Sequence, residues 1–297
     1  MNDMPAAVAN LTFETAHIER AFMDACLLDA TALKPGNVGI HGAGHGMEAA
    51  DFIRSARAAA RPIAAAGRLV GQRIHDAIVA TRKVVQTNTN LGIVLLCAPL
   101  AQAAYQCAPP LSRAALHAAL KRVLHGLTVA DAQWAFDAIR LANPGGLGRA
   151  ARHDVHQSAQ ATLLEAMREA ADRDSIARQY ATAYEDVLEL GLKRLDAARA
   201  LGCDRRWSAT EVFLVFMASL PDSHIARKFG LAQAQFLCAS AAEHAAVAGA
   251  ARTRSAALRA WDVALKARGL NPGTSADLTV VTLFWDGLLR ADGLGAD

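Results

Sequence analysis

The sequence has few aromatic residues and no long uninterrupted hydrophobic run. Only 5% of its 297 residues are aromatic although 53% are hydrophobic, so alanine and leucine supply much of the apolar content. This composition is typical of a globular chain rather than a disordered one, and it favours helices that pack closely together. A chain of this length can bury a substantial core.

An excess of charge of one sign is also missing. The formal net charge is +3, with no block of Lys and Arg and no alternation of basic and aromatic residues. Proteins that follow a phosphate backbone need such patterns, so we do not expect nucleic acid as a partner. The five cysteines are scattered, odd in number and without a Cys-x-x-Cys pair, which argues against a zinc site and against a disulfide framework.

Signals for export or membrane insertion are absent from the sequence. The first residues, MNDMPAAVANLTFETAH, have acids early and no cationic flank before an apolar run, unlike a signal peptide. The most apolar stretch, LGIVLLCAPLAQAA from Leu91, is shorter than the roughly twenty residues of a bilayer span and contains a proline. We therefore expect a buried helix there, no membrane partner and a cytoplasmic location.

Apolar residues recur at the helical period along most of the chain. The pattern predicts helices over residues 15–31, 48–67, 69–86, 91–106, 112–124, 129–143, 155–171, 175–201, 209–220, 225–229, 233–250, 253–268 and 276–289. Ser208-Ala-Thr-Glu211 fits a capping box, and Gly202 and Gly269 lie where a left-handed C-terminal residue belongs. No linker or repeat divides the chain, so we predict one all-α domain over 1–297.

Polar loops interrupt these helices, and the longest is KPGNVGIHGAGHG, which starts at Lys34. Loops of this length are often functional in compact domains. Lys34 offers a cation, and Gly36 and the later glycines would let main-chain N–H groups approach a phosphate closely. His41 and His45 are four apart, but outside a helix that spacing does not predict a metal pair, so exposure and ligand contact both stay open.

Two further segments have a capping explanation and a ligand-binding one. Asp51 and Ser55 share a helix face with Arg54, which predicts either a carboxylate beside the glycine loop or a solvated ion pair. The run from Thr87 to Asn90 supplies four small polar side chains before a helix, where they would cap it or bind an anion or sugar hydroxyl.

The later loops combine acids with cations. Residues 143–149, NPGGLGR, lack both the Walker pattern and a preceding strand, while Asp154 could face a ligand or cap the next helix. The segments 172–174 and 221–228 place carboxylates beside Arg and Lys, which suits helix caps or a triphosphate with Mg²⁺. Thr274-x-x-Asp277 fits another capping box.

Four of these segments form an ordered set of motifs. They are Lys34-Pro-Gly-Asn-Val, Asp51-Phe-x-x-Ser55, Asn88-Thr-Asn-x-Gly92 and Asn271-Pro-Gly-Thr-Ser-Ala-Asp-Leu278. Together they resemble, in the same order, the motifs of the triphosphoribosyl-dephospho-CoA synthase family, from about Asp29 to Leu289. The positions that match family motifs are Lys34, Gly36, Asp51, Ser55, Asn88, Thr89, Gly92, Gly273, Ser275 and Asp277.

The resemblance implies an all-α transferase that uses ATP and Mg²⁺. It would move the 5-triphosphoribosyl group onto the 2'-hydroxyl of 3'-dephospho-CoA and release adenine, making a prosthetic-group precursor for citrate lyase or malonate decarboxylase carrier proteins. The implied partners are ATP and dephospho-CoA or a related acceptor, and a homo-oligomer stays open.

Roles for the candidate residues follow as a hypothesis. Asp51 or Asp277 would act as base or stabilise positive charge at ribose C1. Asp174 and Asp222 would bind Mg²⁺. The residues expected to bind ATP or substrate are Lys34, Gly36, Asn37, His45, Ser55, Asn88, Thr89, Asn90, Arg173, Arg227, Lys228 and Ser275.

One motif departs from the citrate lyase branch, where the sequence is Asn-Thr-His-Lys-Gly. Here Asn90 and Leu91 replace His and Lys, which removes an acid/base group and a cation. The stretches NPGGLGRAARHDV, AADRDSIARQY and IARKFG are more similar to a divergent branch that we associate with archaea and methylotrophs. The alternatives are therefore transfer to an acceptor in tetrahydromethanopterin-linked one-carbon metabolism, nucleotide binding without transfer, or a helical scaffold whose loops are caps.

Overall fold

The computed structural model describes residues 6–108, 110–246 and 251–290, and in these ranges the chain is helical without strands. The elements are α1 (Ala6–Thr31), α2 (Ala49–Ala64), α3 (Val70–Arg82), α4 (Leu91–Ala104), α5 (Arg113–His125), α6 (Val129–Ala142), α7 (Leu163–Ala170), α8 (Ser175–Thr182), the π-helical segment η1 (Val187–Leu192), α9 (Lys193–Ala200), α10 (Arg205–Ser219), α11 (Ser223–Phe229), α12 (Leu231–Ala246), α13 (Ala251–Ala267) and α14 (Gly273–Leu288). The predicted all-α class is confirmed.

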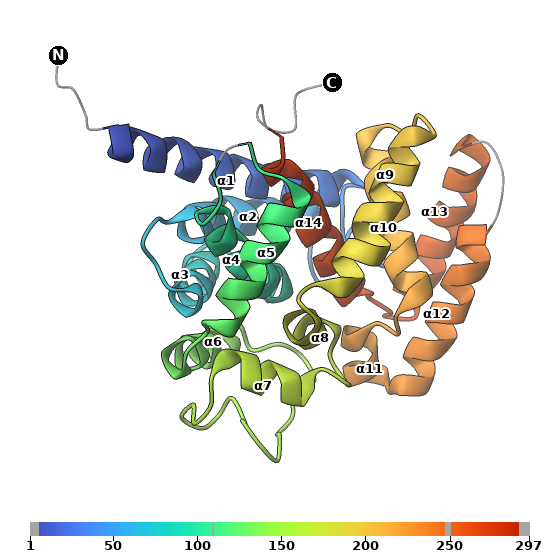
Figure 1. The fold of residues 1–297 in the computed structure, drawn as a ribbon. Helices are drawn as coiled ribbons and strands as arrows, with labels where there is room; N and C mark the ends of the chain where they lie inside the picture. Colours follow the sequence, from blue (N-terminus) through green and yellow to red (C-terminus); the bar gives the residue numbers. More distant parts are fainter. Residues whose placement is uncertain (1–5, 109, 247–250, 291–297) are drawn as a thin grey trace.

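Two helices that are buried on nearly all sides form the centre of the molecule. α4 and α14 pack against each other, and α14 also packs against α1 and α10 (Figure 1). A helix that is hydrophobic all round has no face for water and must be surrounded by protein. The sequence prediction of a buried helix beginning at Leu91 is therefore confirmed.

A proline inside α4 is compensated by a tyrosine from α8. Pro99 has no N–H, so the carbonyl of Leu95 lacks its usual donor four residues later. The Tyr180 hydroxyl donates to that carbonyl at 2.6 Å, and the Tyr184 hydroxyl donates to the carbonyl of Leu96 at 2.7 Å. These two bonds join α8 and the following turn to the middle of α4.

Several predicted helix boundaries are wrong. Residues 155–162 are not helical, and Thr162 rather than Asp154 caps α7. The expected helix over 175–201 breaks at Ala183 and Tyr184, which have φ of 53° and 66°, and continues through the π-helical segment η1. The helical spacing of apolar residues continues across this break because the residues on both sides of it stay buried, so the sequence did not reveal the break. The predicted helix over 233–250 runs partly outside the described residues.

The two predicted capping boxes are also wrong. Asp204 caps α10 by accepting from the Trp207 N–H, so Ser208 lies one turn inside the helix. α14 begins at Gly273, and the Thr274 hydroxyl accepts from the backbone N–H of His224 instead of capping its own helix. By contrast, Gly202 and Gly269 have the predicted left-handed conformation.

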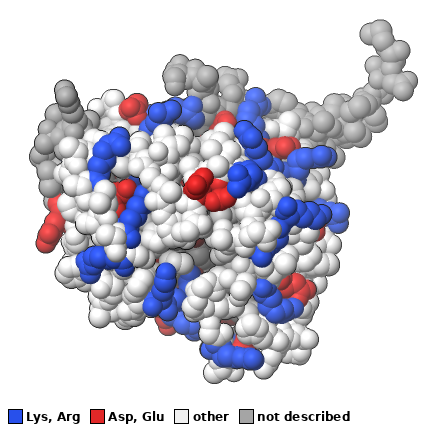
Figure 2. All heavy atoms as spheres, turned by 180° about the vertical axis from the view of Figure 1, so that it is seen from behind, with Lys and Arg blue, Asp and Glu red and all other residues white. Residues whose placement is uncertain are grey.

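On the face shown in Figure 2, Lys and Arg are spread in separate groups rather than gathered into one stripe. Among the described helices, none combines the length and the hydropathy that crossing a bilayer requires.

The bond from Tyr180 to α4 gives a test of the fold. Tyr180→Phe leaves the buried Leu95 carbonyl without a donor, so the free energy of unfolding should fall by about 1–3 kcal/mol. Tyr184→Phe is the matched control and should cost less, since the Leu96 carbonyl keeps the Leu100 amide of its own helix. Urea denaturation measures both, and equal losses would contradict the compensation of the proline.

Candidate active site

The main cavity of the described structure lies where several helices end. Its volume is about 790 Å³, and its lining comes from the α1–α2 loop, the start of α4, the α6–α7 loop, the segment before α8, and the first turns of α11 and α14. Predicted site residues that line it are Asn37, His45, Asn88, Thr89, Asn90, Arg173, Asp174, Arg227, Lys228 and Asp277. The predicted residues outside the lining are Lys34, Gly36, Asp51, Ser55, Asp222 and Ser275.

Lys34 points into the protein at the buried end of the cavity. Its ammonium group pairs with Asp29 and donates to Asn37 Oδ1 at 2.8 Å. The Asn37 amide donates in turn to Asn271 Oδ1 at 2.8 Å. The lysine therefore organises this end of the cavity from below its surface and does not extend into it.

Asp29 lines the cavity and is a site residue that the sequence analysis missed. Its side chain is buried, and its Oδ1 has no hydrogen-bond partner. Burial raises the pKa of this carboxyl, while the ammonium of Lys34 acts to lower it. The only signal in the sequence was its place five residues before Lys34, within a helix.

The Asn-Thr-Asn turn before α4 serves both structure and cavity. Asn88 Oδ1 accepts from the Leu91 N–H at 3.1 Å, and the Thr89 hydroxyl lies 2.5 Å from that of Ser55. Asn90 donates to the Thr81 hydroxyl at 3.0 Å, but its buried Oδ1 has no partner. The capping explanation is confirmed for Asn88, and Asn90 keeps an acceptor available.

Asp277 on α14 lies directly against α4. A Cβ at Gly92 would overlap the Asp277 carboxylate, so any larger residue at this position of the motif would have to displace that side chain. Among the described residues, no hydrogen bond or ion pair engages this carboxylate. Burial is the main cause that raises its pKa well above the usual value, and the charges of Asp222 and Asp29 raise it further.

Asp222 joins the starts of two helices. Its Oδ1 accepts from the backbone N–H groups of His224 and Ile225, and its Oδ2 accepts from the N–H and the hydroxyl of Ser275. Burial raises the pKa of this carboxyl and these hydrogen bonds oppose the rise. Both oxygens are thus occupied within the protein.

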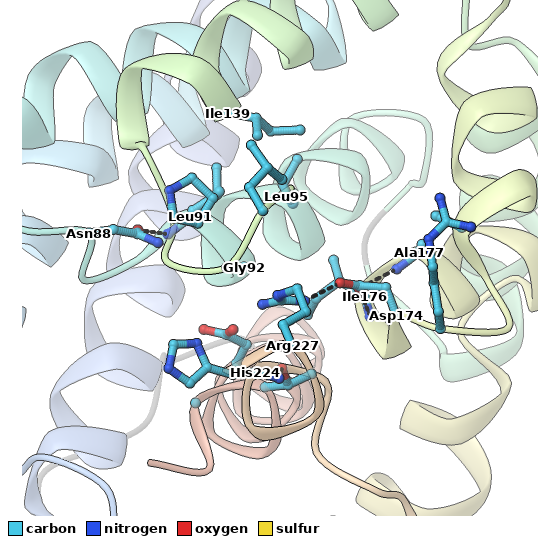
Figure 3. Close-up of a pocket in the computed structure, with 18 of the residues that line it drawn as sticks. Asn88, Leu91, Gly92, Leu95, Ile139, Asp174, Ile176, Ala177, His224 and Arg227 are labelled. Atoms are coloured by element: carbon cyan, nitrogen blue, oxygen red, sulfur yellow. Dashed lines mark hydrogen bonds and ion pairs between the residues drawn. The ribbon is translucent and has the colours of Figure 1, made fainter. Parts of the chain in front are cut away.

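The exposed rim of the cavity carries cations. Asp174 caps α8 and forms an ion pair with Arg227 at 2.5 Å (Figure 3). Arg173 and Lys228 line the rim beside this pair. Arg149 and Arg152 add two cations from the loop before α7.

Two histidines reach the cavity. Burial lowers the pKa of His224 to about 4, helped by the charges of Arg227 and Lys228, so its imidazole is neutral at physiological pH. The His45 Nε2 lies 2.9 Å from the carbonyl oxygen of Gly36, which ties the two ends of the glycine loop together. Neither histidine is part of a group of three His, Cys, Asp or Glu side chains around one point, and no such group occurs in the described ranges.

Asp51 has a structural role at the start of α2. Its carboxylate accepts from the Glu48 N–H at 2.8 Å and pairs with Arg54 at 2.5 Å. The ion-pair alternative weighed from the sequence is therefore the one seen in the structure, and the carboxylate does not line the cavity.

A helical fold with a cavity between helix ends, acidic at its buried end and cationic at its rim, defines an all-α protein with a small-molecule site. Residues 15–295 match the ATP:dephospho-CoA triphosphoribosyl transferase (CitG) family, and the chain belongs to that family. The family resemblance predicted from the four motifs is confirmed.

Known relatives agree with this assignment. The "Probable 2-(5''-triphosphoribosyl)-3'-dephosphocoenzyme-A synthase" of Azotobacter vinelandii is 32% identical over 107 residues, which are 35% of this chain and 36% of that protein. The corresponding synthase of Klebsiella pneumoniae is 31% identical over 104 residues, 35% of this chain and 37% of that protein. The match thus spans little more than a third of the length of these curated relatives.

A solved structure shares the fold. A crystal structure from Archaeoglobus fulgidus, described as that of a "putative triphosphoribosyl-dephospho-coA synthase", matches with a TM-score of 0.61 and 21% identity. The similarity covers 78% of this chain and 95% of that one.

The pKa of Asp277 can be tested through stability. A carboxyl with a raised folded pKa destabilises the native state once it ionises, from its unfolded pKa of about 3.9 upward through the folded value. Asp277→Asn should therefore raise Tm by a few degrees near pH 8, with a smaller effect near pH 4. Calorimetry across this range is the measurement.

Asp51→Asn is the matched control for this stability test. It removes a capping carboxylate and should lower Tm near pH 8. A difference between Asp277→Asn and wild type that does not vary with pH would contradict the raised pKa.

Proposed function

We propose that the chain transfers the 5-triphosphoribosyl group of ATP to the 2'-hydroxyl of 3'-dephospho-CoA and releases adenine. Family membership supports this activity, and the observation that carries it is the unengaged carboxylate of Asp277 in a cavity with a cationic rim. In the reaction the bond from ribose C1 to adenine breaks and a bond from C1 to the acceptor oxygen forms. The acceptor hydroxyl loses one proton and the leaving adenine gains one, so the reaction needs no further reactant.

The rim residues suit the triphosphate. Arg173, Arg227 and Lys228 lie on the segment before α8 and on α11, and Arg149 and Arg152 also line the cavity from the α6–α7 loop. Guanidinium and ammonium groups form strong charge-assisted hydrogen bonds with phosphate oxygens. The triphosphate would compete with Asp174 for Arg227, which pairs with that carboxylate in this structure.

Asp277 suits the proton transfer better than Asp51, the other carboxylate predicted for it. It faces the cavity, whereas Asp51 caps α2 outside the lining. A carboxyl whose pKa is raised toward the working pH is a more effective general base. As an anion it would also stabilise the positive charge that develops on ribose C1 when adenine leaves.

His224 suits the adenine ring. A neutral imidazole can donate one hydrogen bond and accept another, which matches the mixed donors and acceptors of a purine edge. Its backbone is fixed by the bonds to Asp222 and to the Thr274 hydroxyl. The side chain therefore enters the cavity from a rigid helix start.

The residues at the buried end also fit Mg²⁺, the cofactor expected from the resemblance. Asp29 Oδ1 and Asn90 Oδ1 are buried acceptors without donors, and both side chains also line one small second cavity. Mg²⁺ is typically held by one or two protein oxygens together with substrate phosphates. When bound it would neutralise phosphate charge. Asp174 and Asp222, the predicted ligands, instead accept hydrogen bonds within the protein.

The apolar wall of the cavity favours a second candidate, the same transfer to a different acceptor. Leu91, Leu95 and Ile139 lie across the cavity from Arg227 and His224 (Figure 3). Leu91 stands where the citrate lyase branch has a lysine, so a cation that could meet a phosphate of dephospho-CoA is missing. An acceptor of tetrahydromethanopterin-linked one-carbon metabolism would fit this alternative.

The activity is tested by incubating the protein with ATP, Mg²⁺ and dephospho-CoA and measuring adenine by chromatography. We expect adenine release that falls by about 10²–10⁴-fold in Asp277→Asn, the usual contribution of a general base. Asp51→Asn is the control and should keep most of the rate.

Three other outcomes separate the alternatives. Adenine released only with another acceptor would favour the second candidate. ATP binding in a calorimeter without adenine from any acceptor would indicate a nucleotide-binding protein. No shift in Tm with ATP, Mg²⁺ or dephospho-CoA would favour a helical scaffold.

The metal ligands are tested by titrating Mn²⁺ in the presence of ATP and following its electron paramagnetic resonance signal. Asp29→Asn and Asn90→Leu should each weaken Mn²⁺ binding by about tenfold or more, since the first replaces a charged oxygen ligand with a neutral one and the second removes an oxygen ligand. Asp174→Asn is the comparison. Loss of binding in Asp174→Asn alone would place the metal at the predicted rim carboxylate instead.

A further inference from the structure

The glycine loop between α1 and α2, residues 32–48, is held by two charged residues that lie more than 200 positions later in the chain. Asp262 Oδ1 accepts from the Gly36 N–H at 2.8 Å, and Lys266 Nζ donates to the carbonyl of Gly42 at 3.0 Å. Asp262 and Lys266 are one turn apart on α13 and form an ion pair at 2.9 Å. One ion pair thus bonds the main chain of the loop at two separate points.

This ion pair is buried, unlike most pairs at this spacing on a helix. The exposed fractions of the two side chains are 14% for Lys266 and 8% for Asp262. Removing two charges from water is costly, and a buried pair is weak evidence for stability. Its position between a helix and a loop is better explained by the geometry that it fixes.

Gly36 gives independent support, because a larger residue would not fit where the loop meets the end of α13. A Cβ at Gly36, which has φ of 80°, would lie 2.8 Å from the Leu270 carbonyl oxygen. A Cβ at Gly42 would lie 3.0 Å from Lys266 Nζ, and one at Gly44 would lie 3.4 Å from Lys266 Cε. Gly36 therefore lets the backbone approach the end of α13, whereas Gly42 and Gly44 lie mainly against the Lys266 side chain.

The anchored point is next to the residues that form the buried end of the cavity. Lys34 and Asn37 flank Gly36 in sequence, and they bond to each other and to Asp29 and Asn271. The carbonyl of Gly36 also contacts the His45 ring. The position of Gly36 therefore sets where the lysine and the amide meet Asp29.

We propose that Asp262 and Lys266 are positioning residues that hold the 32–48 loop so that Lys34 and Asn37 present Asp29 to the substrates. Neither residue lines the cavity, so both act through the loop. This inference rests on the proposed transfer for its kinetic consequence, but the anchoring itself does not.

Hydrogen exchange with mass spectrometry tests the anchoring directly on the full chain. In Asp262→Ala and in Lys266→Met, amides of residues 35–47 should exchange at least about tenfold faster, while those of α4 stay unchanged. Lys266→Met keeps an unbranched apolar stem beside Gly44 and serves if the alanine variant fails to fold. Unchanged exchange in the loop would overturn the inference.

A matched control is available in the exposed pair Glu189 and Lys193, which has the same spacing. Lys193→Met should leave loop exchange and activity as in wild type. Asp262→Asn keeps an acceptor for Gly36 but loses the charge that pairs with Lys266, so its loop exchange should lie between wild type and Asp262→Ala. Equal exchange in Asp262→Asn and Asp262→Ala would overturn a contribution from the Gly36 bond.

Kinetics tests the consequence for transfer. In Lys266→Met, kcat for adenine release should fall by at least about tenfold with KM for ATP changed less, because the rim cations stay in place while the buried end is displaced. Faster loop exchange with unchanged kcat would overturn the positioning role. If the wild type released no adenine, only the proposed function would fail. The positioning role would then be tested by the affinity of the protein for Mn²⁺, which should fall about fivefold or more in Lys266→Met.

Discussion

The cavity depends on the way Asp222 satisfies the first turns of two helices at once. Helix starts leave backbone N–H groups unpaired and carry partial positive charge, so a single buried carboxylate can bring two of them together. Asp222 does this for α11 and α14, and it accepts four hydrogen bonds in doing so. His224 and Asp277, which are far apart in the sequence, consequently reach the same cavity from rigid backbone.

Features with a local cause could be predicted from the sequence. The helical period and the run of apolar residues at Leu91 predicted an all-α fold around a buried helix. This was possible because the apolar residues that a helix buries are close to one another in the sequence. The motif order predicted the family and most of the segments that line the cavity. The roles of Asn88 and Asp174 as helix caps were also open to prediction, since capping depends on residues only two or three positions away.

Features that depend on contacts distant in sequence could not be predicted. Lys34 looks like a phosphate ligand in a glycine-rich loop, yet its ammonium turns inward because Asp29 lies buried five residues before it. Asp29 itself is one polar residue in an otherwise regular helix. Asp262 and Lys266 have the spacing of an ordinary surface ion pair, and only the packing of the loop against α13 gives them another role.

The proline in α4 has a consequence for motion. Its freed carbonyl is bonded by Tyr180, and Leu95, whose carbonyl this is, also lines the cavity. Separating α8 from α4 would leave a buried acceptor without a donor, so the wall and the rim of the cavity resist hinge opening.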